Sequence, residues 1–337
     1  MSITAKELAH ILNLSEAAIS MALNNKPGVS TQTRKKVVET AKKYGYDFSK
    51  IRENVSETVY RGTIYFLLYK KNGAVVTDTP FFSQLSEGVD QGCKEHHFHL
   101  NISYLYDNDD IPKRISEIIS SDCKGIILLG TEMTEQEFQN FNNLEIPLVL
   151  LDTNFENIRT NCVLIDNLQG AYIATKYLIN VYKSQPGYLK SSYPINNFLE
   201  RTDGFYKAIR RSGMATSTSL VHNLSPSTDG AYADMKELLC HGEKPARCYF
   251  ADNDLIAAGA IRALMEHGYA VPDDIAVIGF DNMPLCTYTT PTLSTIHVPK
   301  QYMGKMAVSR INELLNSPTS RCVKICISTS LIPRDSA

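Results

Sequence analysis

Residues 4–24 read TAKELAHILNLSEAAISMALN, and this stretch decides how the chain begins to fold. Thr4 and Glu7 have the spacing of a capping box, which marks the start of a helix. Asn13 tolerates the left-handed conformation that ends a helix in a tight turn, and Ser15 can cap the helix that follows. The pattern therefore predicts two short helices joined by a tight turn.

A third, basic helix is predicted after residues 27–28, where Pro-Gly breaks the chain. Ser30 can cap this helix, and its surface carries five basic side chains: Arg34, Lys35, Lys36, Lys42 and Lys43. Residues 26–52 hold eight Lys and Arg against two Asp and Glu, whereas the whole chain has a net charge of −2. Three helices of this kind can place one helix in a DNA groove while another braces the phosphate backbone. The alternative is a small helical bundle that contacts only proteins.

The bulk composition is that of a globular protein with more than one core. At 337 residues the chain is long enough for two or three domains, and its hydrophobic content of 43% and charged content of 21% are ordinary. No apolar stretch has the length of an export signal or a membrane span, so we expect a cytoplasmic protein. The eight cysteines are scattered without a CxxC pair, which favours buried, reduced thiols and predicts neither a metal site nor a cofactor.

From Thr63 onward, apolar strand-like runs alternate with amphipathic helical stretches. This alternation is typical of parallel sheets that are covered on both faces by helices. We expect strands at 63–68, 100–103, 125–129, 147–151, 163–165, 187–190, 247–250 and 276–280, and helices at 83–97, 113–121, 167–181, 199–212, 254–268 and 300–315.

Polar side chains follow several of these strands, at the sheet edge where such folds bind their ligands. They are Asp152 and Asn154, Asp166 and Asn167, Asp252 to Asp254, and Asp281 and Asn282. Phe81 and Phe82 open one helix, and Arg201 lies in another. Carboxylates accept hydrogen bonds from sugar hydroxyls, arginine donates to them, and rings cover apolar faces, so we expect a pocket for a polyhydroxylated ligand.

Five of these residues also have a structural alternative. Asp166 and Asn167 favour a turn and a helix cap over a ligand contact, and Asp254 can cap the helix at 254–268. Phe81 or Phe82 alone can equally belong to the core.

Over its whole length the chain resembles the LacI/GalR (lactose-repressor) family of bacterial transcription regulators. In the front part the resemblance rests on three motifs: LS-x3-IS-x2-LN at 14–24, KPGVS-x2-TR at 26–34 and A-x3-GY at 41–46. In the body it rests on five more: VLIDN-x2-GA at 163–171, R-x2-GF at 201–205, ADND-x2-A-x-G at 251–259, PDDI-x-V-x-GFD at 272–281 and P-x-LSTI at 291–296.

This resemblance implies a domain organisation. It predicts an N-terminal all-α helix-turn-helix domain at 1–47, a hinge at 48–61, and an α/β periplasmic-binding-protein-like effector domain at 62–337 with two parallel-sheet lobes. We expect lobe 1 at about 62–161 and 297–318, and lobe 2 at about 162–292 and 320–332.

The resemblance also implies that the second helix enters the major groove of double-stranded DNA. It puts Glu16, Ala17 and Met21 at the base edges and Ser20 near a phosphate. Many relatives carry an arginine where this chain has Met21, so we expect the operator to differ there; the alternative is that Met21 only packs. The full set expected to contact DNA is Thr4, Ser15, Glu16, Ala17, Ser20, Met21, Asn24, Ser30, Arg34 and Val55.

Val55 belongs to the hinge, where the family inserts a leucine pair into the minor groove and kinks the DNA. Valine is shorter and β-branched, so we expect a weaker hinge helix here. The alternative is a plain solvated linker.

In the body, the resemblance implies that Arg201, Asn253 and Asp281 contact the effector, together with Asp152, Phe81 and Phe82. The stretch 187–198, before Arg201, is long and polar, which suggests a ligand other than a common hexose.

Together these features predict a transcription regulator, in the first instance a repressor, whose operator affinity a small carbohydrate effector controls. We expect a homodimer, because no leucine heptad supports a tetramer, and we expect it to bind a pseudo-palindromic operator. We expect no membrane partner. A solute-binding protein would share the body without the front helices. An enzyme is disfavoured because the chain has no GxGxxG opening a helix, P-loop, GxSxG or HExxH motif.

Overall fold

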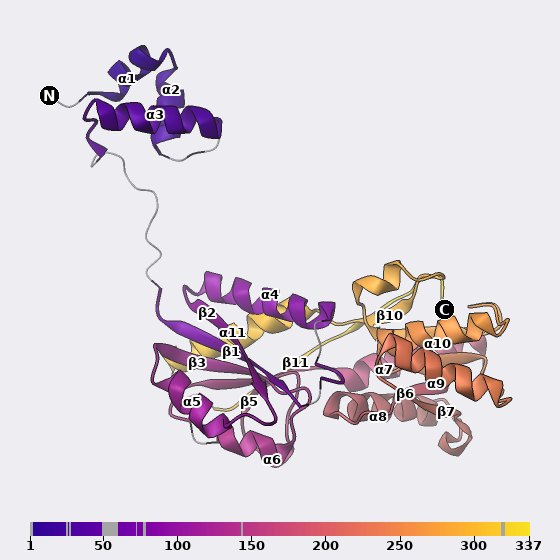
Figure 1. The fold of residues 1–337 in the computed structure, drawn as a ribbon. Helices are drawn as coiled ribbons and strands as arrows, with labels where there is room; N and C mark the ends of the chain where they lie inside the picture. The colour runs from indigo at the N-terminus through magenta and orange to yellow at the C-terminus, as the bar shows by residue number, and fades with distance from the viewer. Residues whose placement is uncertain are drawn as a thin grey trace. The chain divides into compact units, whose positions relative to one another are not determined.

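The computed structural model describes residues 3–24, 26, 28–48, 60–71, 73–76, 79–142, 144–317 and 321–337 (Figure 1). The chain forms two compact units, Met1–Val59 and Tyr60–Ala337. The predicted hinge at 48–61 lies almost wholly outside the described residues. Within those residues, no helix combines the length and apolar character that crossing a membrane needs.

The first unit is a bundle of three helices: α1 (Ala5–Leu12), α2 (Glu16–Leu23) and α3 (Thr31–Lys43). The predicted caps are confirmed, because the hydroxyls of Thr4, Ser15 and Ser30 each accept a backbone N–H three residues on. Asn13 has the expected positive φ of 51° between α1 and α2. The small core includes Leu8, Ile19 and Val37, one from each helix, so the front of the chain has the helix-turn-helix arrangement that the spacing predicted.

The second unit begins with a lobe built on a six-stranded parallel sheet. Its order is β11-β5-β4-β3-β1-β2, with β1 (Thr63–Lys70), β2 (His99–Tyr106), β3 (Cys123–Leu129), β4 (Leu148–Leu151), β5 (Asn161–Ile165) and β11 (Lys324–Ile327). One face packs on α4 (Pro80–Glu95) and α11 (Lys300–Asn316). The other packs on α5 (Ile111–Ile119) and α6 (Glu135–Phe138), which continues into the 3-10 helix η2 (Gln139–Phe141).

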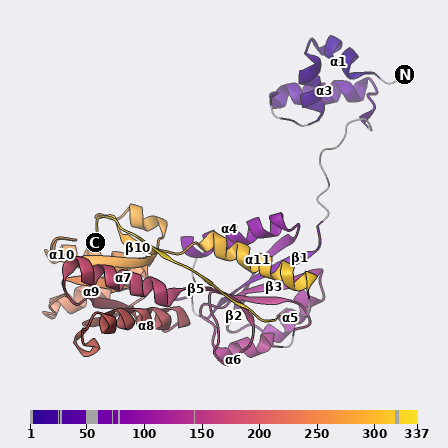
Figure 2. The same cartoon turned by 180° about the vertical axis from the view of Figure 1, so that it is seen from behind.

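The second lobe has a six-stranded sheet of the order β12-β10-β9-β8-β6-β7. Its strands are β6 (Gly187–Ser191), β7 (Val221–Leu224), β8 (Cys248–Ala251), β9 (Ala276–Asp281), β10 (Ser294–His297) and β12 (Ser330–Ile332), and β12 alone is antiparallel. Helices α7 (Asn167–Tyr182) and α8 (Asn196–Arg211) cover one face, and α9 (Thr228–Cys240) and α10 (Asp254–Glu266) cover the other (Figure 2). The short 3-10 helices η3 (Thr216–Thr218) and η4 (Pro284–Thr287) lie in connecting segments.

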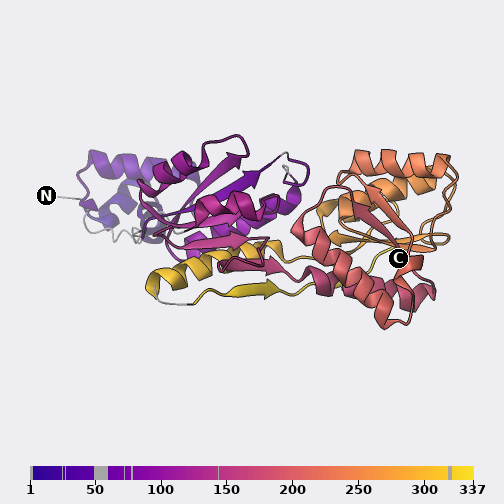
Figure 3. The same ribbon diagram turned by 90° about the horizontal axis from the view of Figure 1, so that it is seen from below.

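The chain crosses between the lobes three times, after β5, after β10 and after β11 (Figure 3). These crossings correct the expected lobe boundaries. Residues 162–165 and 324–327 belong to the first lobe, because β5 pairs with β4 and β11 pairs with β5. Apolar runs show where strands are, but they carry no information on which of two similar sheets a strand joins.

Two other expectations need correction. Helix α9 (Thr228–Cys240) was not predicted, since its first three residues, Thr-Asp-Gly, are weak helix formers. All eight cysteines are free thiols, but three of them are exposed and not buried: Cys240, Cys322 and Cys326.

Helices α4 and α11 pack with their backbones in near contact. A Cβ on Gly88 would lie 2.1 Å from the carbonyl oxygen of Gln301, and one on Gly304 would lie 2.4 Å from that of Leu85. Glycine is therefore required on both helices where α4 and α11 meet. This close packing fixes α4 against α11, the helix that follows β10 and the second connection between the lobes.

We expect Gly88→Ala to lower the free energy of unfolding by about 1–3 kcal/mol, because the added methyl group overlaps backbone atoms that cannot turn aside. The destabilisation from this overlap outweighs the gain of about 1 kcal/mol that alanine brings in helix propensity. Urea unfolding measures the change, and Gln91→Ala, on the exposed side of α4, serves as the control. A Gly88→Ala protein as stable as the wild type would contradict this packing.

Candidate functional site

A cleft of about 590 Å³, part of it open to solvent, lies between the two lobes, where the carboxyl ends of both sheets face each other. The first lobe lines it with Ala74, Val75, Thr79, Phe81, Phe82, Thr131 and Asp152. The second lobe contributes Ile195, Asn197, Phe198, Arg201, Pro226, Ser227, Asn253, Leu255, Asp281 and Met283. The structure therefore brings together in one cleft all six side chains that the sequence singled out as effector contacts.

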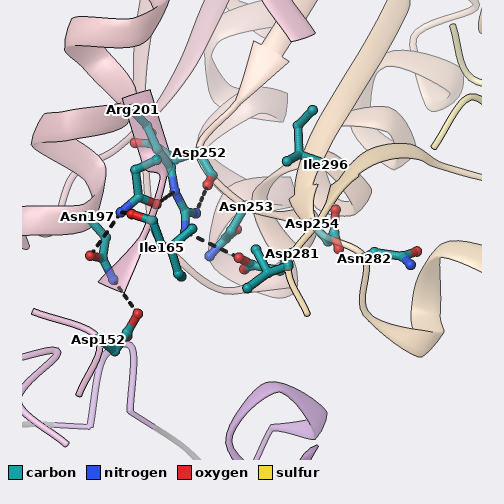
Figure 4. Close-up of polar contacts among 12 residues, drawn as sticks. Asp152, Ile165, Asn197, Arg201, Asp252, Asn253, Asp254, Asp281, Asn282 and Ile296 are labelled. Carbon is teal, nitrogen blue, oxygen red and sulfur yellow. Dashed lines mark hydrogen bonds and ion pairs between the residues drawn. The ribbon is translucent and has the colours of Figure 1, made fainter. Parts of the chain in front are cut away.

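Arg201 lies on α8 with only 3% of its surface exposed. Its Nε donates to Asn167 Oδ1 at 2.9 Å, one terminal nitrogen donates to the carbonyl of Asp252, and the other lies 3.2 Å from Asp281 Oδ1 (Figure 4). The guanidinium also stacks 3.7 Å from the ring centroid of Phe280. These contacts hold the planar group in one orientation at the cleft.

Asp152 connects the two lobes directly. It follows β4 with a positive φ of 67°, is 1% exposed, and accepts a hydrogen bond from Thr131 Oγ1 at 2.6 Å. Its other oxygen accepts from Asn197 Nδ2 at 3.0 Å (Figure 4). Since Asn197 belongs to α8 of the second lobe, this bond crosses the cleft.

Asp152 and Asp281 line the cleft and are buried, and the buried Asp252 and Asp254 flank Asn253, which also lines it. Burial raises the pKa of Asp152 to about 7 and that of Asp252 to about 6. Burial also raises the pKa of Asp254 to about 7, with a further contribution from the negative charge of Asp281. The pKa of Asp281 is raised by burial as well, and the charges of Arg201 and Lys300 oppose that shift. A negative charge is therefore poorly solvated at each of these four buried positions.

The raised pKa of Asp152 predicts a pH dependence of stability. The pKa of about 7 in the folded protein lies above the ordinary value of 3.8. Between these two pH values the folded protein keeps a proton that the unfolded chain has released, so stability falls as the pH rises from the lower value to the higher. Between about pH 6 and about pH 8 this group should cost about 1 kcal/mol. We expect thermal unfolding of Asp152→Asn to show a correspondingly weaker fall. An identical slope in both proteins would contradict the shifted pKa.

The contacts of three other acidic and amide residues show which of them cap helices. Asp166 caps α7 through the N–H of Gln169 at 2.9 Å, as its structural alternative predicted. Asp254 does not cap α10; it accepts from Met283 N and Thr295 Oγ1 at 2.8 and 2.5 Å. Asn253 is the cap, through Ile256 N at 2.8 Å, and it also lines the cleft.

Sequence reasoning missed several residues that line the cleft, above all Asn197 and Thr131. The expected helix at 199–212 begins earlier, as α8 starts at Asn196. Asn197 therefore lies one helical turn before Arg201, on the face that meets the cleft. The run Asn196-Asn197 ahead of Arg201 was a signal for it, whereas a single threonine after a strand gives none.

In the first unit, the residues proposed to contact DNA fall into two groups. Glu16, Ala17 and Ser20 are exposed on α2, and Met21 is half-buried beside them. The other described members are held by local contacts: Thr4, Ser15 and Ser30 act as caps, and Asn24 Nδ2 donates to Ser20 O at 2.8 Å. Val55 lies outside the described residues.

Arg34 has a structural role that its basic character did not reveal. Its guanidinium donates to the carbonyls of Met21 at 3.2 Å and Lys26 at 2.6 Å, near the end of α2. A cation at this position is favourable because the C-terminal end of a helix carries a partial negative charge. Arg34 thus positions α2 in addition to any contact with phosphate.

A helix-turn-helix unit followed in the chain by a bilobed binding unit defines a class of ligand-responsive DNA-binding proteins. Comparisons with known proteins agree with this class. Residues 195–337 match the model of the periplasmic binding protein-like domain. The chain is 31% identical to the HTH-type transcriptional regulator GalS of Salmonella typhimurium, over 90% of this chain and 88% of that protein. The chain belongs to the LacI/GalR family of transcription regulators.

Two solved structures show the same fold over almost the whole chain. The complex of the transcriptional regulator CelR with cellobiose matches with a TM-score of 0.73 at 22% identity, over 99% of this chain and 100% of that one. The lac repressor dimer bound to operator and the anti-inducer ONPF matches with a TM-score of 0.68 at 18% identity, over 100% and 99%. These two structures show the fold; the membership in the family that the similarity to GalS establishes makes the chain a transcription regulator and not an enzyme.

Proposed function

We propose that this regulator represses transcription by binding a pseudo-palindromic operator through α2 of two copies, and that a neutral carbohydrate in the interlobe cleft changes its operator affinity. The observation that carries the effector part is the hydrogen bond from Asn197 to Asp152 across the cleft. A ligand that replaces or reinforces this bond changes how the two lobes close on each other.

The DNA part rests on the exposed face of α2. Glu16, Ala17 and Ser20 are free to meet base edges and phosphates, and Met21 offers an apolar surface at its rim. Glu16 suits a cytosine amino group, and Ala17 and Met21 suit thymine methyl groups. We assign these four residues to operator readout.

The charges in the cleft favour a neutral ligand. Of the described residues that line it, Arg201 is the single cation, and it already faces Asp281. Asp152 adds a second carboxyl group that can accept from ligand hydroxyls, while Phe81 and Phe82 provide apolar rings. A carboxylate or phosphate on the ligand would meet two carboxyl groups and no unshared cation, which disfavours uronic acids and sugar phosphates.

Dimerisation is the third part of the proposal. Strand β2 forms an edge of the first sheet, and Ile102, Tyr104 and Tyr106 on it are 46%, 40% and 47% exposed. Apolar side chains on an open edge strand favour association. We propose that a second copy covers this edge, which would present two α2 helices to the two half-sites of the operator.

The test is operator selection from a random duplex pool by the full-length protein, followed by gel retention with D-ribose, D-galactose, cellobiose or D-glucuronate. We expect a palindromic consensus, and a change of about 5–150-fold in its affinity with at least one neutral sugar. Failure to retain any duplex would refute the DNA part. A response to glucuronate without a response to any neutral sugar would refute the ligand class.

A further inference from the structure

A buried carboxylate that no prediction from the sequence included holds the described part of one wall of the cleft. Glu132 follows β3, is 4% exposed, and does not itself line the cleft. Within the described part of the segment after β1, it accepts backbone hydrogen bonds from four residues. Its Oε2 accepts from Lys71 N and Gly73 N at 2.9 and 3.3 Å, and its Oε1 accepts from Val75 N and Val76 N at 2.7 and 2.9 Å.

The segment that Glu132 holds supplies part of the binding surface. Ala74 and Val75 line the cleft, and Val76 is fully buried in the core of the first lobe. Gly73 has a φ of 69°, so the backbone curls back on itself here. The four N–H groups point inward to the carboxylate, and the side chains of Ala74 and Val75 face the cleft.

The chemistry requires a carboxylate at this point. An ionised carboxylate has two oxygens and no proton, so it can accept from all four amides and none of the donors is left unpaired. A glutamine of the same size keeps one accepting oxygen and turns an NH₂ group toward the other two N–H groups. No cavity opens, so the damage should remain local.

Glu132 also adjoins the contact between the lobes. The preceding residue, Thr131, donates to Asp152, which in turn accepts from Asn197 of the second lobe. One short turn after β3 therefore fixes the interlobe carboxyl group through Thr131 and the apolar wall of the cleft through Glu132.

We propose that Glu132 is a positioning residue for effector binding: it sets the conformation of residues 71 and 73–76 and so determines how tightly the cleft holds its ligand. The part that concerns ligand affinity rests on the proposed effector function of the cleft. The part that concerns the conformation of the segment does not.

The decisive experiment is hydrogen exchange on full-length Glu132→Gln without ligand, with Glu135→Gln as the matched control three residues further on. We expect amides in 71–76 to exchange at least about tenfold faster in Glu132→Gln alone. Operator affinity without ligand should stay at the wild-type value. The melting temperature should fall by at most about 10 °C, because stability is lost where buried N–H groups become unpaired. Unchanged exchange at 71–76, or faster exchange across the whole first sheet, would overturn the proposal.

The ligand arm uses the sugar, among D-ribose, D-galactose and cellobiose, that binds the wild-type protein. We expect Glu132→Gln to bind it about tenfold or more weakly and Glu135→Gln to bind it normally. Equal affinity in all three proteins would overturn the positioning role. If the wild-type protein binds none of these sugars, the proposed effector function has failed at its own test, while the exchange comparison still decides whether Glu132 holds the wall.

Discussion

Arg201→Ala should leave a protein that binds operator but no longer responds to effector. The side chain holds Asn167, the carbonyl of Asp252 and the carboxyl group of Asp281 in one arrangement at the cleft. Its removal leaves Asp281 buried without its guanidinium, which costs about 3–5 kcal/mol of stability in comparable cases. The helix-turn-helix unit has its own core, so its contacts with DNA do not depend on this side chain.

Gel retention with and without the sugar measures the response, and urea unfolding measures the stability. Arg201→Lys retains the charge but cannot reproduce the planar fork, so we expect a weakened response and a smaller loss of stability. Arg210→Ala, at an exposed arginine on the same helix, is the matched control. A normal effector response in Arg201→Ala would remove this residue from the site.

Ala17→Glu should have the opposite result, with operator binding lost and effector binding retained. Ala17 is exposed on α2, between Glu16 and the half-buried Met21 on the proposed groove-facing surface. A carboxylate placed there approaches the phosphates and replaces a methyl contact with a charge that the groove cannot solvate. We expect operator affinity to fall by about 100-fold at physiological salt.

Ala17→Gln separates charge from size in this experiment. Glutamine has the bulk of glutamate without its charge, so we expect a smaller loss that changes little with salt. The gap between the two variants should widen as salt is lowered, because phosphate repulsion is then less screened. Equal losses at every salt concentration would show that α2 is sensitive to size alone and would argue against its position near the backbone.

Local chemistry made much of this structure predictable. Thr4 with Glu7, Ser15 and Ser30 cap their helices because each cap needs only residues three positions apart. The polar residues after parallel strands were predictable for a related reason, since the carboxyl ends of such strands meet at one edge of a sheet. Asp152, Asn253 and Asp281 accordingly lie in one cleft.

What could not be predicted depends on contacts between distant segments. Strand β11 joins β5, some 160 residues earlier in the chain, and nothing in its own residues selects that partner. The sequence predicts Arg34 as a surface cation, because its contacts near the end of α2 exist only in the folded unit. Glu132 gives no signal at all, because its four partners are backbone groups, which every sequence provides.

The three crossings between the lobes have a mechanical consequence. Two of them leave the first lobe from neighbouring strands, β5 and β11, and two reach or leave the second lobe at neighbouring strands, β10 and β12. Connecting segments that lie side by side in this way resist sliding and separation of the lobes more than they resist bending between them. The lobes are therefore expected to bend about these three crossings more readily than to slide or separate, so that a ligand in the cleft would act mainly on the angle between them.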